Sequence, residues 1–395
     1  MKSVSVRSCK TYNYEEVKLS IEKNLEDIGG IDKFVKKGSK VLIKPNLLMK
    51  KKPEEATTTH PMVVKVVCEK LLELNCDITI ADSPGGPYNQ SSLKSIYKAS
   101  GIEEVANELG IKLNYDVSDV KIHSEKAHVL KYMDIIKPIV DSDYIINLCK
   151  LKTHIMATFT GGTKNLYGCI AGLKKAEIHY RFPTEELFCE NVLLDICDYI
   201  KPTLTIMDGI VGMEGDGPSA GTTREIGVLL ASQNPYAIDV VACKIISLLP
   251  NRVATIRGAI KRGYIQEDFS DIEILGEDIK DLIIKNYKIP NVSKDLRLFS
   301  VKLPKFLNEP ISKLITPKPV VRFQDCIKCG KCKEACPAST IEIGTKGAII
   351  DLSKCIRCYC CHELCPKKAI DVKRNFVFKL SLIHISEPTR LRRIS

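Results

Sequence analysis

Two cysteine motifs near the end of the chain, CIKCGKCKEACP at residues 326–337 and CIRCYCCHELCP at residues 355–366, decide the fold of that region. Both have the spacing C-x2-C-x2-C-x3-C-P. Three cysteines spaced in this way wrap one loop around a cube of iron and sulfide, and the loop amides then point at the sulfurs. The fourth thiolate has to come from elsewhere, and in two-cluster proteins it is the last cysteine of the other motif. The spacing therefore predicts two 4Fe–4S clusters.

The crossed arrangement divides the eight motif cysteines into two sets. One cluster is predicted to be held by Cys326, Cys329, Cys332 and Cys365, and the other by Cys355, Cys358, Cys361 and Cys336. A pair of zinc ribbons is the alternative, because zinc ribbons also use C-x2-C. Zinc sites need only four ligands and seldom show a third cysteine at this spacing followed by Cys-Pro, so iron–sulfur clusters are favoured.

Around these motifs, the stretch from about Val320 to Lys373 resembles the bacterial two-cluster ferredoxins. All eight ligand positions and both prolines are present, and Ile349 and Ile350 fill the apolar positions between the motifs. The resemblance implies a small α+β ferredoxin-like domain at residues 320–379 that handles electrons one at a time. The ninth cysteine of the region, Cys360, fits no ligand position.

Cysteine usage and the lack of a leader indicate a reducing compartment. Of the 17 cysteines in 395 residues, nine lie between Cys326 and Cys365. In a long chain that starts without an apolar leader, such a cluster is typical of metal ligation rather than of disulfides. No apolar run approaches the ~18 residues that a membrane helix requires. We expect a cytoplasmic protein without membrane segments, in which most of the other cysteines are small core residues.

The net charge of +11 does not indicate nucleic-acid binding. The lysines are spread along the chain, and no basic helix, arginine-rich tail or alternation of aromatic and basic residues is present. Acidic partners or anionic substrates explain the surplus equally well.

The end of the chain has an unusual sequence, because LSLIHISEPTR at residues 380–390 looks like a translated sequencing adapter. We therefore treat residues 380–395 as a non-native tail, the alternative being a genuine amphipathic C-terminus.

Before residue 290 the chain alternates short β-rich runs with helical stretches. Buried strands are predicted at residues 41–44, 77–81, 144–148, 204–207 and 227–231, and helices at residues 62–74, 185–200 and 236–248. Thr184, with two glutamates behind it, resembles a helix N-cap. This alternation predicts an α/β domain at residues 1–289, with a mostly parallel sheet and helices on both faces. The proline-rich stretch at residues 290–319 is predicted to be a linker.

Polar phrases follow several of these strands, and together they resemble the family called domain of unknown function 362. The phrases are KPNLL (44–48), TTHP (58–61), ADSPGG (81–86), NLCKLKTH (147–154), GGTKNLYGC (161–169), MDGIVGMEGDGP (207–218) and PYAIDVVA (235–242). Members of this family often carry a two-cluster ferredoxin module at the C-terminus. Cys149 departs from the family phrase, in which proline is expected. The resemblance implies fold and architecture but no established reaction.

Because open α/β sheets bind ligands at the carboxyl ends of their strands, these phrases predict a polar site there. The candidate catalytic residues, as cations or acid–base groups, are Lys44, His60, Lys152, His154 and Lys164. The candidate pocket for an anion or a further metal ion of unknown identity contains Asn46, Asp82, Gly161, Gly162, Asn165, Asp208 and Glu214. The alternative for each residue is structural: a solvated lysine, an ion pair, or an aspartate that closes a turn.

Three functions are compatible with this pattern. The leading hypothesis is an iron–sulfur electron-transfer protein that passes low-potential electrons to or from an anion-binding site in the α/β domain, or to a partner protein. If that site is catalytic, the protein is an oxidoreductase. The second is a non-enzymatic ferredoxin whose α/β domain docks a partner. The third is a non-redox enzyme with structural or sensory clusters. No flavin, haem or nicotinamide motif supplies a two-electron cofactor, which a site that reduces an organic substrate usually needs.

Overall fold

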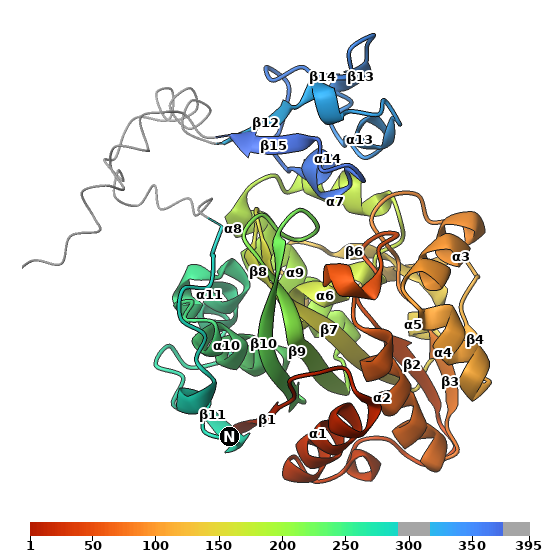
Figure 1. Cartoon of the computed structure of the whole chain (residues 1–395), viewed down its shortest axis with the longest axis vertical. Coiled ribbons are helices and arrows are strands. Elements are labelled where there is room, and N and C mark those ends of the chain that lie inside the picture. Colours follow the sequence, from red (N-terminus) through yellow and green to blue (C-terminus); the bar gives the residue numbers. More distant parts are fainter. Residues whose placement is uncertain (291–316, 374–395) are drawn as a thin grey trace, which may run out of the picture. The chain divides into compact units, whose positions relative to one another are not determined.

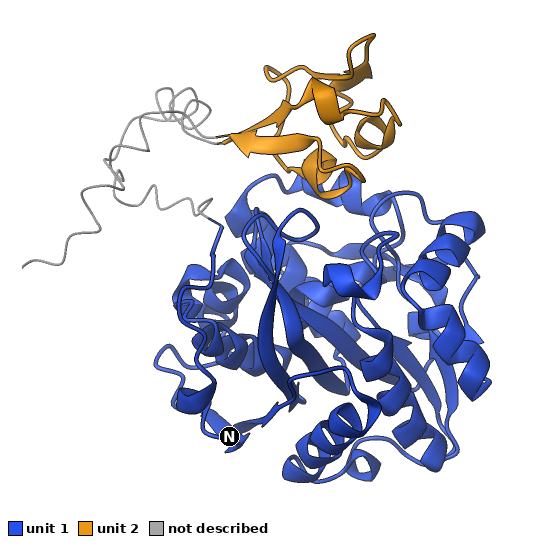
Figure 2. Ribbon diagram, viewed as in Figure 1, with its two compact units in different colours: residues 1–291 blue, residues 292–395 orange. Residues whose placement is uncertain are grey.

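The computed structural model describes residues 1–290 and 317–373, and the chain divides into two compact units, Met1–Asn291 and Val292–Ser395 (Figures 1 and 2). The predicted tail at residues 380–395 lies outside the described residues, as does most of the predicted linker at residues 290–319. Its last residues belong to a strand, since β12 begins at Lys318. Within the described residues, no helix is long and apolar enough to cross a membrane.

The first unit is built on a nine-stranded sheet of order β11-β1-β10-β9-β7-β2-β3-β4, with β8 paired to β7 (Figure 1). Its strands are β1 (Lys2–Ser8), β2 (Lys40–Lys44), β3 (Asp77–Ile80), β4 (Lys112–Leu113), β7 (Tyr144–His154), β8 (Thr158–Thr160), β9 (Leu204–Glu214), β10 (Thr222–Ser232) and β11 (Ile272–Gly276). The pairs that join β9, β7, β2, β3 and β4 are all parallel, whereas β10 runs antiparallel to both β1 and β9. The predicted, mostly parallel sheet is confirmed.

Helices cover both faces of this sheet. They are α1 (Tyr14–Asp27), α2 (Pro61–Glu73), α3 (Gln90–Ala99), α4 (Ile102–Leu109), α5 (Lys137–Val140), α6 (Gly162–Asn165), α7 (Lys174–Arg181), α8 (Glu185–Leu187), α9 (Leu193–Ile200), α10 (Pro235–Ile245) and α11 (Ala254–Lys261). In β2, Val41 and Ile43 pack into the core under α1 to α4, whereas Leu42 packs into the core under α9 to α11. Alternate side chains of a strand point to opposite faces, so both faces are buried. A separate hairpin pairs β5 (Asp119–His123) with β6 (Tyr132–Ile136).

All five predicted strands are present, but three are longer than the sequence indicated: β10 begins five residues earlier, and β7 and β9 continue beyond their predicted ends. Lys150–His154 and Asp208–Gly209 were expected to be loops after strands, and instead they lie inside β7 and β9. Each extension has its own pairing partner, because β8 pairs with the end of β7, and β9 continues into a hairpin with β10. These polar residues are therefore held by backbone ladders rather than by loops.

The predicted helices are also present, with one irregularity. The stretch from residue 185 to residue 200 is helical throughout, but a π-helical turn at Phe188–Val192 separates α8 from α9. Thr184 caps α8, since its side chain accepts a hydrogen bond from the amide of Leu187, as predicted. The eight cysteines of the first unit are all buried, in agreement with their expected role as core residues.

The second unit is small, and its two halves have the same backbone pattern. Its elements are β12 (Lys318–Val321), α13 (Lys331–Glu334), β13 (Ile341–Ile343), β14 (Ala348–Ile350), α14 (Cys360–Glu363) and β15 (Ile370–Lys373). Strand β12 pairs with β15, and β13 pairs with β14, both antiparallel. Lys328 and Arg357 occupy equivalent motif positions and share a φ of 57°. Where the first motif has Gly330 at a positive φ, the second has Tyr359. The two cysteine loops are thus copies of one conformation.

Candidate functional site

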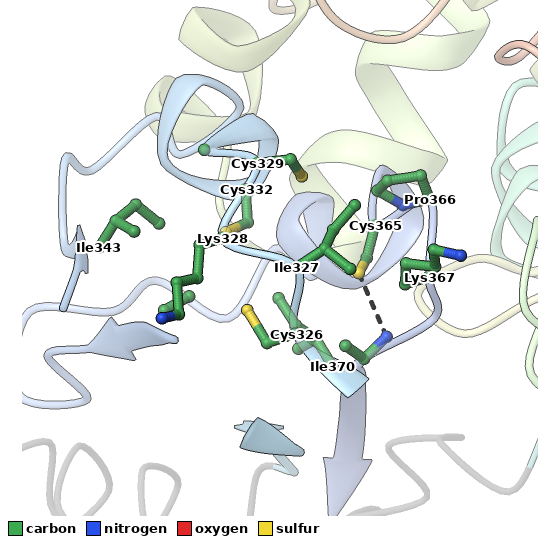
Figure 3. A pocket seen from close by; sticks show the side chains of 13 residues that line it. Cys326, Ile327, Lys328, Cys329, Cys332, Ile343, Cys365, Pro366, Lys367 and Ile370 are labelled. Atoms are coloured by element: carbon green, nitrogen blue, oxygen red, sulfur yellow. Dashed lines mark hydrogen bonds between the residues drawn. The ribbon is translucent and has the colours of Figure 1, made fainter. Parts of the chain in front are cut away.

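The first cysteine set surrounds a cavity in the second unit (Figure 3). The lining includes Cys326, Cys329, Cys332 and Cys365, which are the four residues of the first predicted set. Apolar side chains such as Ile343 and Ile370 close the cavity around them. Cys326 and Cys329 come from the loop before α13, Cys332 lies in α13, and Cys365 precedes β15, so the side chains of both motifs meet here.

The second cysteine set surrounds a similar cavity. Its lining includes Cys336, Cys355, Cys358 and Cys361, the four residues of the second predicted set, together with Ile341, Ile350 and Ile356. The empty space within the first lining, part of which is open to solvent, amounts to about 360 Å³, and that within the second to about 320 Å³. The grouping of side chains in both cavities is the one that crossed ligation requires.

Backbone amides point at several of these sulfurs. The amide of Ala369 donates to Sγ of Cys365 at 3.2 Å, and the amide of Thr340 donates to Sγ of Cys336 at 3.4 Å. Both donors lie four residues after the cysteine, which reflects the repeated backbone. Hydrogen bonds of this kind stabilise the negative charge on a thiolate and tune the reduction potential of a bound cluster. Four convergent thiols, amide donors and an apolar lining together fit a 4Fe–4S cluster in each cavity.

The two cavities differ in how far their cysteines are covered. Cys329 of the first set is exposed, and the neighbouring Ile327 is 56% exposed. In the second set, Cys358 and Cys361 are both buried. Buried Tyr359 also lines the second cavity, and its hydroxyl donates to the carbonyl oxygen of Pro317 at 2.8 Å. Each set also has two half-buried cysteines, so the first cavity differs from the second by its one exposed cysteine, Cys329.

In the first unit, the predicted polar residues begin with an ion pair at the ends of β2 and β3. Nζ of Lys44 lies 2.8 Å from Oδ1 of Asp82, and both side chains are buried. The other carboxylate oxygen of Asp82 accepts from the amide of Leu47 at 2.7 Å. Gly168 packs against the pair so closely that a Cβ at this position would lie 2.1 Å from Oδ1 of Asp82. Any side chain there would displace the pair.

A second buried ion pair joins β7 and β9. Nζ of Lys150 lies 2.8 Å from Oδ2 of Asp208 and 2.8 Å from the hydroxyl of Tyr12. The same hydroxyl donates to Oδ1 of Asp208 at 2.9 Å. The ring of His60 stacks on Tyr12 with centroids 3.5 Å apart, and the backbone amide of His60 donates to Asp208 at 2.9 Å. Burial lowers the pKa of His60 to about 4, so its imidazole is neutral near pH 7.

Lys152 belongs to a network of amide side chains between these pairs. Its Nζ donates to Oδ1 of Asn46 at 2.7 Å and to the carbonyl oxygen of Thr57 at 2.6 Å. Asn46 in turn donates to Asn165 at 2.9 Å, and Asn165 donates to Asn147 at 2.7 Å. Because Nδ2 of Asn165 also lies 3.4 Å from the carbonyl oxygen of Lys44, the network reaches the first ion pair. Five of the predicted residues thus form one hydrogen-bonded network: Lys44, Asn46, Asp82, Lys152 and Asn165. His60 and Asp208 adjoin it, because the amide of Asn46 donates to Oγ1 of Thr59, the residue before His60.

The remaining predicted residues are bonded in other ways. Half-buried Lys164 lies over the ring of Tyr167, with Nζ 5.7 Å from the centroid. Nδ1 of His154 accepts from the amides of Met156 and Ala157 at 3.0 and 3.2 Å, so this ring shapes the turn after β7.

The predicted glycine turn and the predicted acidic residue Glu214 each have another partner. Gly161 and Gly162 lie against Asp239, which accepts from the amide of Gly162 at 2.6 Å. Glu214 at the end of β9 pairs with Lys288, with 3.3 Å between Oε1 and Nζ. Asp82, Asp208 and Glu214 therefore have three different cationic partners. Among residues 1–290, no group of three His, Cys, Asp or Glu side chains is placed to hold a single metal ion.

Sequence reasoning missed several members of this region. Lys150 pairs with Asp208 because the β7–β9 register sets the two residues opposite each other, and the sequence carries no local signal for that register. Tyr12 comes from the loop before α1, and no local pattern links it to residues nearly two hundred positions away. Asn147 stands inside the apolar run that marked β7 as a strand, where a buried amide was the available signal.

Comparisons with known proteins agree with the two-part organisation. Residues 41–244 match the family model described as "Domain of unknown function (DUF362)", and residues 318–366 match the model described as "4Fe-4S dicluster domain". A curated thylakoid-associated protein of Synechocystis sp. is 31% identical over 296 residues, which cover 74% of this chain and 89% of that protein.

Two solved structures are similar over part of the chain. The lactate racemase apoprotein from Thermoanaerobacterium thermosaccharolyticum has a TM-score of 0.39 and 14% identity, and the match covers 58% of this chain and 54% of that one. A protein from Thermotoga maritima has a TM-score of 0.35 and 14% identity, covering 58% of this chain and 57% of that one. The match spans little more than half the length of either structure.

Proposed function

The chain belongs to the DUF362 family and carries a 4Fe–4S dicluster domain, and on this premise we propose that it is an iron–sulfur electron-transfer protein that exchanges single low-potential electrons with a partner protein. The observation that carries the proposal is the pair of cavities, each lined by three cysteines of one motif and the last cysteine of the other. This is the ligand arrangement of two-cluster ferredoxins.

Each residue set has a defined role in this proposal. The first cluster is held by Cys326, Cys329, Cys332 and Cys365, and the second by Cys336, Cys355, Cys358 and Cys361. A 4Fe–4S cluster, when bound, supplies one-electron chemistry. The chain keeps water away with the apolar lining and stabilises the thiolates through the amides of Thr340, Arg357 and Ala369, which point at cysteine sulfurs.

The partner is proposed to contact the first cluster. Cys329 is exposed there, with exposed Ile327 beside it, whereas the second cavity has buried Cys358 and Cys361. Lys328 and Lys367 also line the first cavity and give its rim a positive charge. A partner with an acidic rim around an apolar centre fits this surface, because complementary charge speeds encounter. Such a protein functions in a reducing compartment, which agrees with the cysteine usage.

Electron exchange measured by rapid mixing tests this face. Anaerobic, reduced protein is mixed with an oxidised acidic ferredoxin as the probe, and cluster absorbance is followed. Ile327→Glu should slow exchange about tenfold or more by placing a negative charge at the contact. Ile349→Glu is the matched control, because Ile349 is 57% exposed and does not line the first cavity. Equal rates for the two variants would contradict the proposed face, and a parent protein that exchanges no electrons would contradict electron transfer.

The α/β unit is proposed to serve either an anionic ligand or partner docking. Lys44, Lys152 and Lys164 remain the candidate cations and His60 and His154 the candidate acid–base groups, with the acidic and amide residues around them as the pocket. Anion binding measured by calorimetry with inorganic phosphate distinguishes the two roles. Weaker binding in Lys152→Gln supports the anion site, and no binding by the parent leaves docking as the role of this unit.

A further inference from the structure

A serine and a lysine from distant parts of the first unit form a close pair beside the Lys44–Asp82 ion pair. Ser83 follows β3 in the ADSPGG phrase, and Lys175 lies in the first turn of α7. Nζ of Lys175 is 2.7 Å from Oγ of Ser83. The hydroxyl is buried, and the lysine is half-buried. None of the contacts involves the cysteines, so the pair is independent of the clusters.

Nζ of Lys175 donates to Oγ of Ser83 and to two backbone carbonyl oxygens. Nζ lies 2.8 Å from the carbonyl oxygen of Ser83 and 3.2 Å from that of Pro84. A neutral amine has two protons for these carbonyls and one lone pair left for the hydroxyl proton. Oγ of Ser83 meanwhile accepts from the amide of Gly172 at 2.9 Å. Once Nζ has lost one proton, its remaining two protons serve the carbonyl oxygens, and its lone pair can accept the hydroxyl proton of Ser83.

The surroundings favour loss of the proton from Lys175. Burial is the main cause that lowers its pKa to about 7. Asp82 and Cys169 act in the opposite direction, whereas the positive charges of Lys44 and Lys164 lower the pKa further. A lysine that is neutral near pH 7 can act as a general base, which an exposed lysine with its ordinary pKa cannot.

We propose that Ser83 and Lys175 form a nucleophilic dyad that accepts an acyl group from a small carboxylic ester. Oγ of Ser83 attacks the carbonyl carbon, and its proton moves to Nζ of Lys175. The bond to the leaving alcohol breaks, and the alcohol takes that proton. Water then cleaves the acyl-serine: its proton goes to Lys175 and returns to Ser83 as the acid departs. No electron is transferred, so this is a non-redox activity beyond the proposed electron transfer.

The backbone around Ser83 holds it in place for this reaction. Its amide donates to the carbonyl oxygen of Gly168 at 2.9 Å. Gly172 has a φ of 37°, in the region that favours glycine, and a Cβ there would lie 2.6 Å from Cβ of Tyr88. The loop from Gly168 to Gly172 therefore fixes both the backbone and the hydroxyl of the nucleophile.

Covalent labelling of the full chain with a small fluorophosphonate tests the dyad, because this reagent reacts with activated serines. Peptide mass spectrometry should find one adduct per chain, on Ser83. The labelling rate should rise about tenfold from pH 6 to pH 8 as Lys175 loses its proton. Ser232→Ala, which removes another buried serine hydroxyl bonded to a carbonyl, should label like the parent.

Substitutions of Lys175 show whether this residue acts as a general base or only as a structural cation. Lys175→Met should lower the labelling rate at least tenfold, and so should Lys175→Arg, because a guanidinium keeps hydrogen-bonding capacity but does not give up its proton. Circular dichroism melting checks that each variant is folded. The proposal is overturned if the folded parent carries no adduct on Ser83, or if Lys175→Arg labels at the parental rate. The parental result decides the matter even where a variant does not fold.

Discussion

The cysteine cavities of the second unit and the lysine network of the first unit differ in what surrounds their polar side chains. In the cavities, sulfurs from two motifs converge and are surrounded by apolar side chains. In the network, charged and amide side chains bind directly to one another, as Lys150 does with Asp208 and Lys152 with Asn46. Thiols that converge on one space can bind a cluster, whereas charged side chains that pair with each other hold strands together. A cluster of polar residues in a sequence therefore predicts a ligand only where the side chains converge on a common space instead of bonding to one another.

The largest effect on stability is expected from changing the buried ion pair of Lys150 and Asp208. Lys150→Met leaves a buried carboxylate without its cation and should lower the free energy of unfolding by about 3–5 kcal/mol. Lys150→Met combined with Asp208→Leu should recover part of this loss, since no charge then remains buried. Urea denaturation followed by circular dichroism measures the free energy of unfolding of the single and the double variant. The iron content of both variants should equal that of the parent. A single variant as stable as the parent would mean that this pair does not hold β7 to β9.

A smaller effect is expected from the pH dependence of the same region. His60 has its pKa lowered to about 4 in the folded state, whereas an unfolded histidine titrates near 6.5. Between these values the unfolded chain binds more protons, so stability rises with pH from about 4 to 6.5 and is lost as pH falls. The contribution is at most about 3 kcal/mol, at about 1.4 kcal/mol for each pH unit.

The variant His60→Asn isolates this contribution, because asparagine keeps an N-cap acceptor for α2 and does not titrate. Its stability should depend less on pH than that of the parent between pH 4.5 and 6.5. The exposed His123→Asn is the control and should follow the parent. Parallel curves for the parent and His60→Asn would show that His60 is not the group responsible.

The smallest effect is expected in the cavities, where one hydroxyl distinguishes the two halves. Oγ1 of Thr340 lies 3.3 Å from Sγ of Cys336, and the equivalent residue in the other half is Ala369, which has no hydroxyl. Thr340→Val should lower the reduction potential of the second cluster by tens of millivolts at most, because the reduced cluster loses a donor. Ala369→Val is the matched control. A redox titration followed by electron paramagnetic resonance would contradict this account if the first cluster shifted instead.

Much of the fold followed from local sequence signals. The strand at residues 41–44 and the N-cap at Thr184 depend on neighbouring residues, and both are present. The cysteine grouping was also accessible, because the spacing of each motif dictates a loop. The pairing of Lys150 with Asp208 was not accessible, because it depends on how far β7 and β9 extend and on their register. A one-residue difference in register would have placed another side chain opposite Asp208.

Contacts between distant segments were likewise beyond the sequence. Lys175 and Ser83 lie 92 residues apart, and neither stands in a recognisable nucleophile motif. Tyr12 reaches Lys150 from a loop that carries no sequence signal. Such pairs are created by the packing of loops over the end of the sheet, which hydrophobic periodicity does not specify.

The most direct test of the central claim is the cluster content of the full chain and of two serine variants purified anaerobically. The parent should contain about eight irons and eight sulfides, as two 4Fe–4S clusters require. Cys336→Ser should disturb the cluster of the second motif, and Cys365→Ser the cluster of the first, as resolved by electron paramagnetic resonance. Two zinc ions without sulfide in the parent, or loss of each variant's own-motif cluster, would contradict the crossed iron–sulfur sites.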